Sequence, residues 1–404
     1  MGGVAAVTID DIPDNCLACI FQLFPPADQK KLSLVCRRWL KVEGHTHHRL
    51  CLTLPYSSVL ASIFSRFDSV TDLTLQCPNL MSMCDGNLVV ISDLCPNLIR
   101  LQITKCSYLS YAGLEVLARS CERLKSFSCT SCTFGPNSID ALIHHCTTLE
   151  QLSIEYSTVT THGAQFLNFY PLIRAKNLTT VKIVQCSVEE YWDMFFHSLA
   201  SQVTSLLEVH LDGCGVSDNG LRAISKFPNL ETLHLVKTHK CTHAGLVAVA
   251  EGCNKSLRKL CINVSDWKGT NKIGDKGLIA FAKCCSNLQE LVLIGMNPSK
   301  ASLKILASNC QSLEHLGLWG SNKFGDTEIC CIAGKCVALK ELHIERCPRV
   351  YDRDIKTLAA KCPNLVRVKV FECKWVTERD EYVRYHRRLV HVTCKPRTAC
   401  RSPL

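Results

Sequence analysis

The chain has 404 residues, of which 46 are basic, 36 are acidic and 28 are cysteine, and its formal net charge is +10. Residues 1–10 lack the basic and apolar regions of a secretion signal, and no apolar run approaches the ~20 residues of a membrane helix. We therefore expect no membrane partner and a reducing compartment, either nucleus or cytoplasm. Disulfide scaffolds are typical of short secreted chains, so this composition does not favour one.

The N-terminal segment, residues 9–43, has the apolar spacing of two short amphipathic helices. Pro13 suits the first turn of a helix that ends at Pro25-Pro26, and Asp28 can cap a second helix. The two apolar stripes consist of Leu17, Ile20, Phe21 and Phe24, and of Leu32, Val35, Cys36 and Trp39. Further apolar side chains that need cover are Ile12, Leu23, Leu34 and Leu40. The pattern fits either a cap that seals the adjoining domain or a surface that binds a partner.

The rest of the chain repeats one pattern, L-x-x-L-x-L-x-x-C, with aliphatic substitutions. Its twelve copies begin 24 to 31 residues apart, at Val70, Leu98, Leu124, Leu149, Leu178, Leu206, Leu230, Leu257, Leu288, Leu313, Leu339 and Leu365. This period is that of leucine-rich repeats. Each copy supplies a short strand and a helical return segment, such as residues 111–121. Because one unit cannot bury its apolar face alone, we expect an α/β repeat solenoid, a horseshoe with a parallel concave sheet.

The cysteines follow the same period, which predicts small buried side chains and no metal site or disulfide. One set follows the strand: Cys106, Cys132, Cys186, Cys214, Cys347 and Cys373. A second set ends the helix: Cys95, Cys121, Cys146, Cys285, Cys310, Cys336 and Cys362. Other copies place Ser157, Thr238, Ser265, Met296 or Ser321 after the strand. A metal ligand or disulfide partner would not tolerate that variation.

The x positions of each x-L-x-L-x strand face the concave surface, where most of them are polar. Two neighbouring copies depart from this rule, because residues 290–296 expose Val292 and Ile294 and residues 315–321 place Gly317 and Trp319 beside them. An aromatic anchor in an apolar centre with a charged rim is typical of an interaction site. The predicted substrate-binding residues are Val292, Ile294, Gly317, Trp319, His343 and Lys369. The alternative is that another part of this chain covers the patch.

Three other features are possible binding elements. His210 and His234 occupy equivalent positions in consecutive copies, but no third and fourth ligand is evident, so we expect no metal. The histidines of residues 45–49 also lack companion ligands and fit a polar loop. The insertion at residues 265–275 is a secondary candidate for ligand contact, because insertions in repeat arrays often contribute to binding.

The C-terminal segment, residues 377–404, is rich in arginine and lysine. A nucleic-acid contact is conceivable, but the end of a solenoid needs a polar cap, and that interpretation is favoured. We therefore expect three parts: a helical domain at residues 9–52, the repeats at 53–376 and a basic cap or tail at 377–404.

Residues 9–43 resemble an F-box. Ile12-Pro13 stands where that family has Leu-Pro, and residues 32–39, "LSLVCRRW", are similar to its most recognisable stretch. The departures are Ile12 itself and Cys16-Leu17, where acidic or aliphatic residues are common. The repeats at 70–373 resemble the cysteine-containing leucine-rich repeats of F-box proteins, including the "DxGL" turns at 218–221 and 275–278. Within that family the resemblance is to the plant VIER F-BOX group of Skp-interacting proteins.

The resemblance implies a non-catalytic substrate receptor of an SCF-type ubiquitin ligase, with no cofactor. The F-box would bind a Skp adaptor, and through it a cullin and a RING protein, while the repeats hold a protein that is ubiquitinated for proteasomal degradation. The implied adaptor-binding residues are Ile12, Pro13, Leu17, Ile20, Phe21, Leu32, Leu34, Val35, Cys36 and Trp39. The alternative is a repeat scaffold whose N-terminal helices are only a cap and which joins no ligase.

Overall fold

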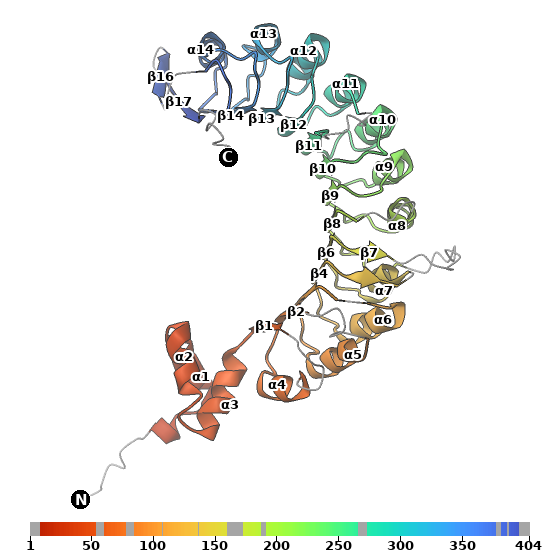
Figure 1. The fold of residues 1–404 in the computed structure, drawn as a ribbon, viewed down its shortest axis with the longest axis vertical. Coiled ribbons are helices and arrows are strands. Elements are labelled where there is room, and N and C mark those ends of the chain that lie inside the picture. Colours follow the sequence, from red (N-terminus) through yellow and green to blue (C-terminus); the bar gives the residue numbers. More distant parts are fainter. Residues whose placement is uncertain are drawn as a thin grey trace, which may run out of the picture. The chain divides into compact units, whose positions relative to one another are not determined.

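The structure is a computed structural model that describes residues 9–53, 60–77, 85–106, 108–135, 137–159, 173–186, 191–265, 273–376, 381–385 and 388–395. The chain divides into two compact units, residues 1–177 and 178–404, which we call unit 1 and unit 2. Figure 1 labels their helices and strands.

Unit 1 begins with a small helical domain. Its elements are η1 (Ile9–Asp11), α1 (Asp14–Gln22), α2 (Pro26–Leu32) and α3 (Arg37–Thr46). The sequence predicted two helices here, and that prediction was wrong for the second one. Cys36 has an extended backbone, and its Sγ accepts a hydrogen bond from the N–H of Trp39 at 3.4 Å, so a third helix starts there. The second helix begins at Pro26, earlier than the predicted cap at Asp28.

The strands of unit 1 are β1 (Arg49–Thr53), β2 (Asp72–Gln76), β3 (Arg100–Thr104), β4 (Ser126–Thr130) and β6 (Gln151–Glu155), with a separate short pair, β5 (Thr133–Phe134) and β7 (Thr158–Val159). Its repeat helices are α4 (Leu60–Arg66), α5 (Asp85–Leu94), α6 (Tyr111–Ser120) and α7 (Ser138–His145). The five long strands pair in parallel in the order given. The expected domain boundary at residue 52 falls inside β1, which pairs with β2.

Unit 2 continues the same alternation. Its strands are β8 (Thr180–Val184), β9 (Glu208–Asp212), β10 (Thr232–Val236), β11 (Lys259–Asn263), β12 (Glu290–Ile294), β13 (His315–Trp319), β14 (Glu341–Glu345), β15 (Arg367–Phe371), β16 (Glu381–Tyr385) and β17 (Arg388–Lys395). Its helices are α8 (Tyr191–Ala200), α9 (Asp218–Ile224), α10 (His243–Gly252), α11 (Asp275–Cys284), α12 (Lys300–Asn309), α13 (Asp326–Ile332) and α14 (Asp352–Lys361). The strands β8 to β15 pair in parallel, β17 pairs in parallel with β15, and β16 is antiparallel to β17.

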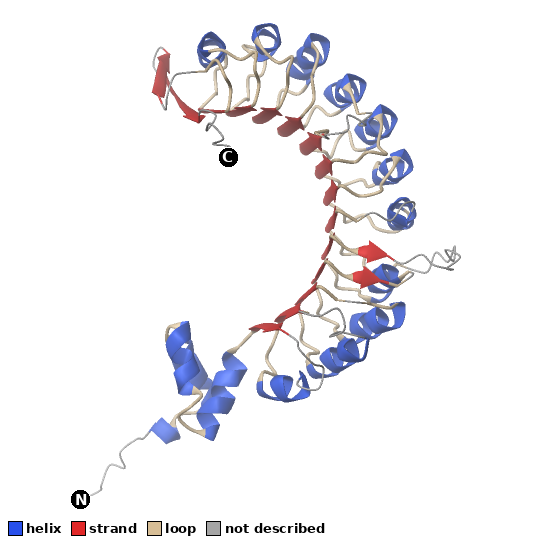
Figure 2. Ribbon diagram, viewed as in Figure 1, coloured by secondary structure: helices blue, strands red, loops and turns tan. Residues whose placement is uncertain are grey.

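The predicted repeat register is confirmed, because a strand begins two residues after each of the twelve predicted starts. In each unit the helices cover one face of the sheet and leave the other open (Figure 2). We call the open face the concave face. The leucines of the repeat point away from it and are buried, as Leu101 and Leu291 illustrate. This is the fold class that the sequence predicted, a leucine-rich-repeat α/β solenoid with a helical segment before it.

The cysteines of the two predicted sets are buried in the core, as predicted. All thirteen cysteines of the two predicted sets have at most 6% exposed surface, and each is a free thiol. The backbone N–H of Cys106 donates a hydrogen bond to Sγ of Cys132, at 3.4 Å. In the next repeat, the backbone N–H of Cys132 donates a hydrogen bond to Oγ of Ser157, at 3.0 Å. These side chains therefore fill the core and also satisfy a backbone donor that the turn after the strand leaves unpaired.

The "DxGL" turns join consecutive repeats. The carboxylate of Asp218 accepts hydrogen bonds from the backbone N–H of Thr242 at 2.7 Å and from its hydroxyl at 2.6 Å. A side chain on Gly220 would meet the carboxylate of Asp193, with 2.4 Å between its Cβ and Oδ1. Glycine is thus required because the aspartate of the preceding repeat approaches the helix so closely.

Candidate functional sites

The helical domain has a small core of its own. Leu17, Phe21 and Val42 are at most 2% exposed, and Ile12, Ala18, Leu32 and Trp39 pack against them. The rings of Phe21 and Trp39 lie 4.9 Å apart between centroids. These side chains hold α1, α2 and α3 together, so they determine the shape of the domain.

Other apolar side chains of the helical domain point into solvent. Leu23 is 84% exposed and Phe24 42%, at the end of α1, where Ile20 is also exposed. Leu34 is 83% exposed and Val35 61%, in the connection between α2 and α3. Exposed apolar side chains are normal when single, but five from two short segments of one small domain indicate an interaction surface. We call these five residues, Ile20, Leu23, Phe24, Leu34 and Val35, the apolar surface.

The structure divides the ten predicted adaptor-binding residues into two groups. Leu17 and Phe21 are buried, and Ile12, Leu32 and Trp39 are partly buried against them, so these five support the surface from within. The exposed members are Pro13, Ile20, Leu34, Val35 and Cys36. The predicted set omitted Leu23 and Phe24, although the sequence analysis noted both side chains as apolar. Their position directly before Pro25-Pro26, where the helix must end, was the signal that could have placed them on the surface.

A cluster of polar contacts around the buried Glu43 joins the helical domain to the first repeat. Glu43 is 2% exposed, and its carboxylate lies 2.6 Å from Nε2 of His47 and 2.8 Å from Nη2 of Arg66 in α4. A Cβ on Gly44 would lie 2.4 Å from the carbonyl oxygen of Arg66, so α3 and α4 approach at a position that only glycine fits. The histidine-rich stretch at residues 45–49 thus belongs to this junction, where His45 also contacts Asp68.

The predicted substrate-binding residues of unit 2 line a depression of about 350 Å³ on the concave face. We call it the Gly317 depression. Its lining residues are Glu290, Val292, His315, Leu316, Gly317, Trp319, Glu341, His343 and Lys369. Five of the six predicted residues are among them, and the sixth, Ile294, lies directly beside Trp319 in the strand register. The structure places these residues together; their role in binding stays a prediction.

Aromatic rings form one wall of the Gly317 depression. The ring of His343 lies 5.0 Å from that of Trp319 on β13 and 5.0 Å from that of Phe371 on β15, both tilted edge-to-face. Burial lowers the pKa of His343, while the nearby Glu345 carboxylate raises it by a smaller amount. The ring is therefore neutral at pH 7. The wall is therefore aromatic and uncharged.

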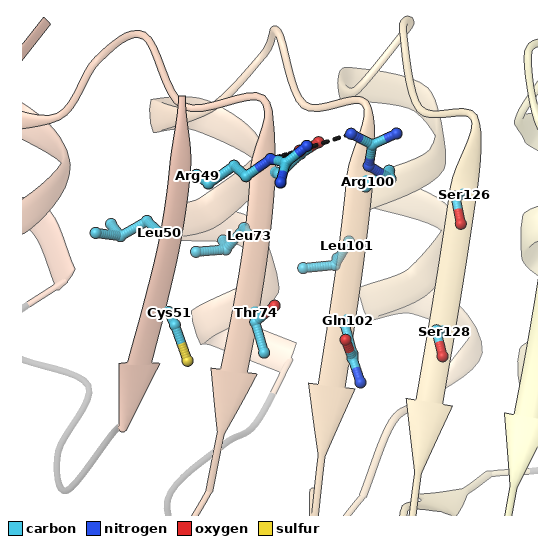
Figure 3. A pocket seen from close by; sticks show the side chains of 11 residues that line it. Arg49, Leu50, Cys51, Leu73, Thr74, Arg100, Leu101, Gln102, Ser126 and Ser128 are labelled. Carbon is cyan, nitrogen blue, oxygen red and sulfur yellow. Dashed lines mark hydrogen bonds and ion pairs between the residues drawn. The ribbon is translucent and has the colours of Figure 1, made fainter. Parts of the chain in front are cut away.

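A second depression, of about 520 Å³, lies on the concave face of unit 1. Figure 3 shows it, with the side chains of Arg49 and Arg100 near one end of the strands. Nε of Arg49 and Nη2 of Arg100 donate hydrogen bonds to Oδ2 of Asp72, at 3.0 and 2.7 Å. The other polar side chains that line it are short or uncharged: Cys51, Thr74, Gln102, Ser126 and Ser128. Both arginines are more than half exposed, so the ion pairs contribute little to stability.

The described residues contain no group of three or more histidine, cysteine, aspartate or glutamate side chains that could hold a metal ion. The rings of His210 and His234 do lie side by side, tilted to one another, with 4.3 Å between their centroids. The core of the insertion, residues 266–272, lies outside the described residues, and so do the side chains of most of the basic C-terminal segment. In the described part of the chain no helix is long and apolar enough to cross a membrane.

Two family models match the chain. Residues 9–42 match the F-box domain, and residues 204–225 and 269–282 match a leucine-rich repeat. The first match covers the helical domain, with its core and its apolar surface. The second falls on repeats of unit 2.

Curated plant proteins match across the chain. Coronatine-insensitive protein 1 of Arabidopsis thaliana is 23% identical over 396 residues, which cover 78% of this chain and 63% of that protein. F-box protein FBX14 of the same species is 23% identical and covers 75% of this chain and 50% of its own length. The chain thus spans less than two thirds of the length of these relatives.

Among solved structures, a chain of the Rad7 and Elc1 complex in yeast covers 96% of this chain with a TM-score of 0.51 at 14% identity, which shows the fold alone. The chain thus carries an F-box domain and leucine-rich repeats, and it is similar to plant proteins that include an F-box protein. The VIER F-BOX subgroup stays a prediction.

Proposed function

We propose that the chain is the substrate-recognition subunit of an SCF-type ubiquitin ligase. The observation that carries the proposal is the apolar surface on a domain that matches the F-box model. Leu23 and Leu34, the two most exposed of its side chains, would be costly to leave in water and are suited to burial against a Skp adaptor. The adaptor in turn would connect the chain to a cullin and a RING protein.

In this proposal the repeats hold the protein substrate on the concave face, with the Gly317 depression as the contact site. The mechanism is positional, because holding a substrate lysine beside a ubiquitin-charged enzyme raises its effective concentration and needs no acid, base or nucleophile from this chain. The junction of Glu43 with Arg66 supports this mechanism, since a partly buried ionic contact couples the F-box to the first repeat. The proposal includes proteasomal degradation of the substrate and a nuclear or cytoplasmic location.

Co-purification with a Skp adaptor tests the proposal. The double variant Leu34→Asp/Val35→Asp places two charges on the apolar surface, and we expect it to lose at least tenfold in adaptor affinity, since burying an unpaired charge is costly. The matched control is Val366→Asp in unit 2, which is also an exposed valine, at 57%, and should bind like wild type. Leu17 and Trp39 are unsuitable for this test because their substitution would disturb the core of the helical domain.

If wild-type protein fails to bind any Skp adaptor while its fold is intact by circular dichroism, the receptor proposal is wrong. The chain is then a repeat scaffold with a helical cap. Equal binding by wild type and the double variant would instead show that the adaptor uses another surface. That result would remove the observation on which the proposal rests.

A further inference from the structure

Gly317 opens a gap in the concave face of unit 2. The third residues of β12, β13 and β14 are in register, and they are Val292, Gly317 and His343. A Cβ on Gly317 would lie 3.2 Å from a methyl group of Val292, so any side chain there would fill the space between its neighbours. Without one, Gly317 itself is buried between these neighbours, and the backbone of β13 forms the floor of the Gly317 depression.

Two polar atoms beside this gap have no hydrogen-bond partner among the described residues. They are Nε1 of Trp319 and Nε2 of His343, and both are buried. The nearest carboxylate oxygen to the histidine nitrogen belongs to Glu345, at 4.0 Å, too far for a hydrogen bond. An unpaired buried polar group costs free energy that a bound partner can recover. The indole N–H needs an acceptor, and a neutral imidazole nitrogen can use either a donor or an acceptor.

The charges around the depression are already paired within the chain. Glu341 contacts Lys369 at 3.7 Å and also Arg367, and Glu290 contacts Lys259 at 4.0 Å. A charged side chain entering the depression would have to compete with these pairs and would meet a neutral aromatic wall. The depression therefore favours an uncharged occupant.

The dimensions fit a short extended segment of polypeptide. Parallel strands lie about 4.8 Å apart, so the distance from β12 to β14 is about 10 Å. An extended chain advances about 3.3 Å per residue, so roughly three residues cross this distance. A peptide backbone also offers both a carbonyl oxygen and an N–H at each residue, which suits the two unpaired nitrogens.

From these observations we propose that the Gly317 depression binds an uncharged, extended segment of the substrate protein. One compact aliphatic side chain of the segment lies over Gly317, and its backbone carbonyls accept hydrogen bonds from the indole of Trp319 and from His343. This inference rests on the proposed function, since it specifies the substrate class of that receptor. It goes further by naming the side chain and the backbone groups that are recognised.

The test is an array of N-acetylated, C-amidated ten-residue peptides whose central residues are varied among aliphatic, aromatic, acidic and basic types. The full chain is applied as wild type and as three variants. Gly317→Val fills the gap and should reduce the bound signal at least tenfold. Trp319→Phe keeps a ring and removes the N–H, and should reduce the signal severalfold. Ser128→Val is the control, because it makes a similar change on the concave face of unit 1 and should bind like wild type.

The inference predicts that wild type selects peptides with a central leucine, isoleucine, valine or methionine and no charged neighbour. Selection of acidic or basic centres would overturn it, and so would full binding by Gly317→Val or the absence of any bound peptide. If Gly317→Val proves unfolded by circular dichroism, the Trp319→Phe result decides. Adaptor co-purification is measured on the same preparations, so that failure of peptide binding alone overturns this inference, and failure of adaptor binding overturns only the receptor proposal.

Discussion

The concave faces of the two units differ sharply although their strands are built alike. In β2, β3, β4 and β6 of unit 1, the third residues are Thr74, Gln102, Ser128 and Ser153. In β9 to β14 of unit 2, they are His210, His234, Cys261, Val292, Gly317 and His343. The buried second and fourth positions are apolar in both units and mostly aliphatic. The comparison teaches that alternation along a strand lets one set of residues maintain the fold while the other set varies.

The prediction with the largest expected effect, on the free energy of unfolding, tests whether the two units share one kind of core. Leu101 in β3 and Leu291 in β12 occupy equivalent buried positions. Replacing either by alanine should lower the free energy of unfolding by about 2–5 kcal/mol, since each substitution leaves a cavity in a close-packed interior. Urea unfolding of the two purified variants measures this. The control Gln102→Ala, on the exposed side of β3, should change stability by about 0.5 kcal/mol or less. A large cost in one unit only would contradict the shared core.

A smaller effect concerns the pH dependence of stability, which one histidine from each unit can test. Burial lowers the pKa of His144 in α7 and of His234 in β10 from 6.5 to about 4. Below pH 6.5 the unfolded chain takes up a proton that the folded chain does not, so stability is complete above pH 6.5 and falls as the pH decreases toward 4. One pKa unit corresponds to about 1.4 kcal/mol, and the partial exposure of His234 makes its share the smaller one.

Denaturation at pH 7 and pH 5 compares wild type with His144→Leu and His234→Leu. Each variant should lose less stability between the two pH values than wild type does. The groups that face His234 are His210, Glu208 and Lys259, and the group that faces His144 is His145. An unchanged pH dependence in both variants would show that other groups dominate the acid response.

The smallest effect concerns the residue after each strand. Cys132 in unit 1 and Cys347 in unit 2 have Sγ atoms near backbone carbonyl oxygens, 3.5 Å from Thr130 and 3.4 Å from Glu345. Ser157 already fills the same slot in one repeat with good hydrogen bonds. Cys132→Ser and Cys347→Ser should therefore each cost less than the corresponding alanine variants, by about 1 kcal/mol. Thermal unfolding measures the difference, and alanine variants as stable as the serine ones would show that the hydrogen bond contributes nothing.

The repeats were predictable because their period is a local property of the sequence. Apolar residues at the buried strand positions, and in most copies a cysteine at one or both ends of the unit, recur every 24 to 31 residues, so the strand starts followed directly. The neighbours of Gly317 were predictable for the same reason. Once the register is known, equivalent residues of consecutive repeats must lie side by side.

The helical domain was harder to predict, since its stripes do not repeat. The helical spacing of the apolar residues from Leu32 to Trp39 predicted one continuous helix. In the structure one helix ends before Ser33 and another begins after Cys36. The prolines after Leu23 and Phe24 were a signal that these two side chains are exposed, but no comparable pattern separated the buried Leu17 and Phe21 from the exposed Leu34. In a domain this small, burial depends on how three helices pack, and several packings satisfy the same stripes.

The sequence by itself determined the repeat fold, the burial of its cysteines and the alignment of residues across neighbouring strands, because these depend on spacing along the chain. Only the tertiary structure decided which apolar side chains of the F-box face solvent, how Glu43 and Arg66 join it to the first repeat, and that Trp319 and His343 keep unpaired nitrogens beside Gly317. These features depend on contacts between segments that are distant in sequence or on side-chain orientations, which spacing alone does not specify.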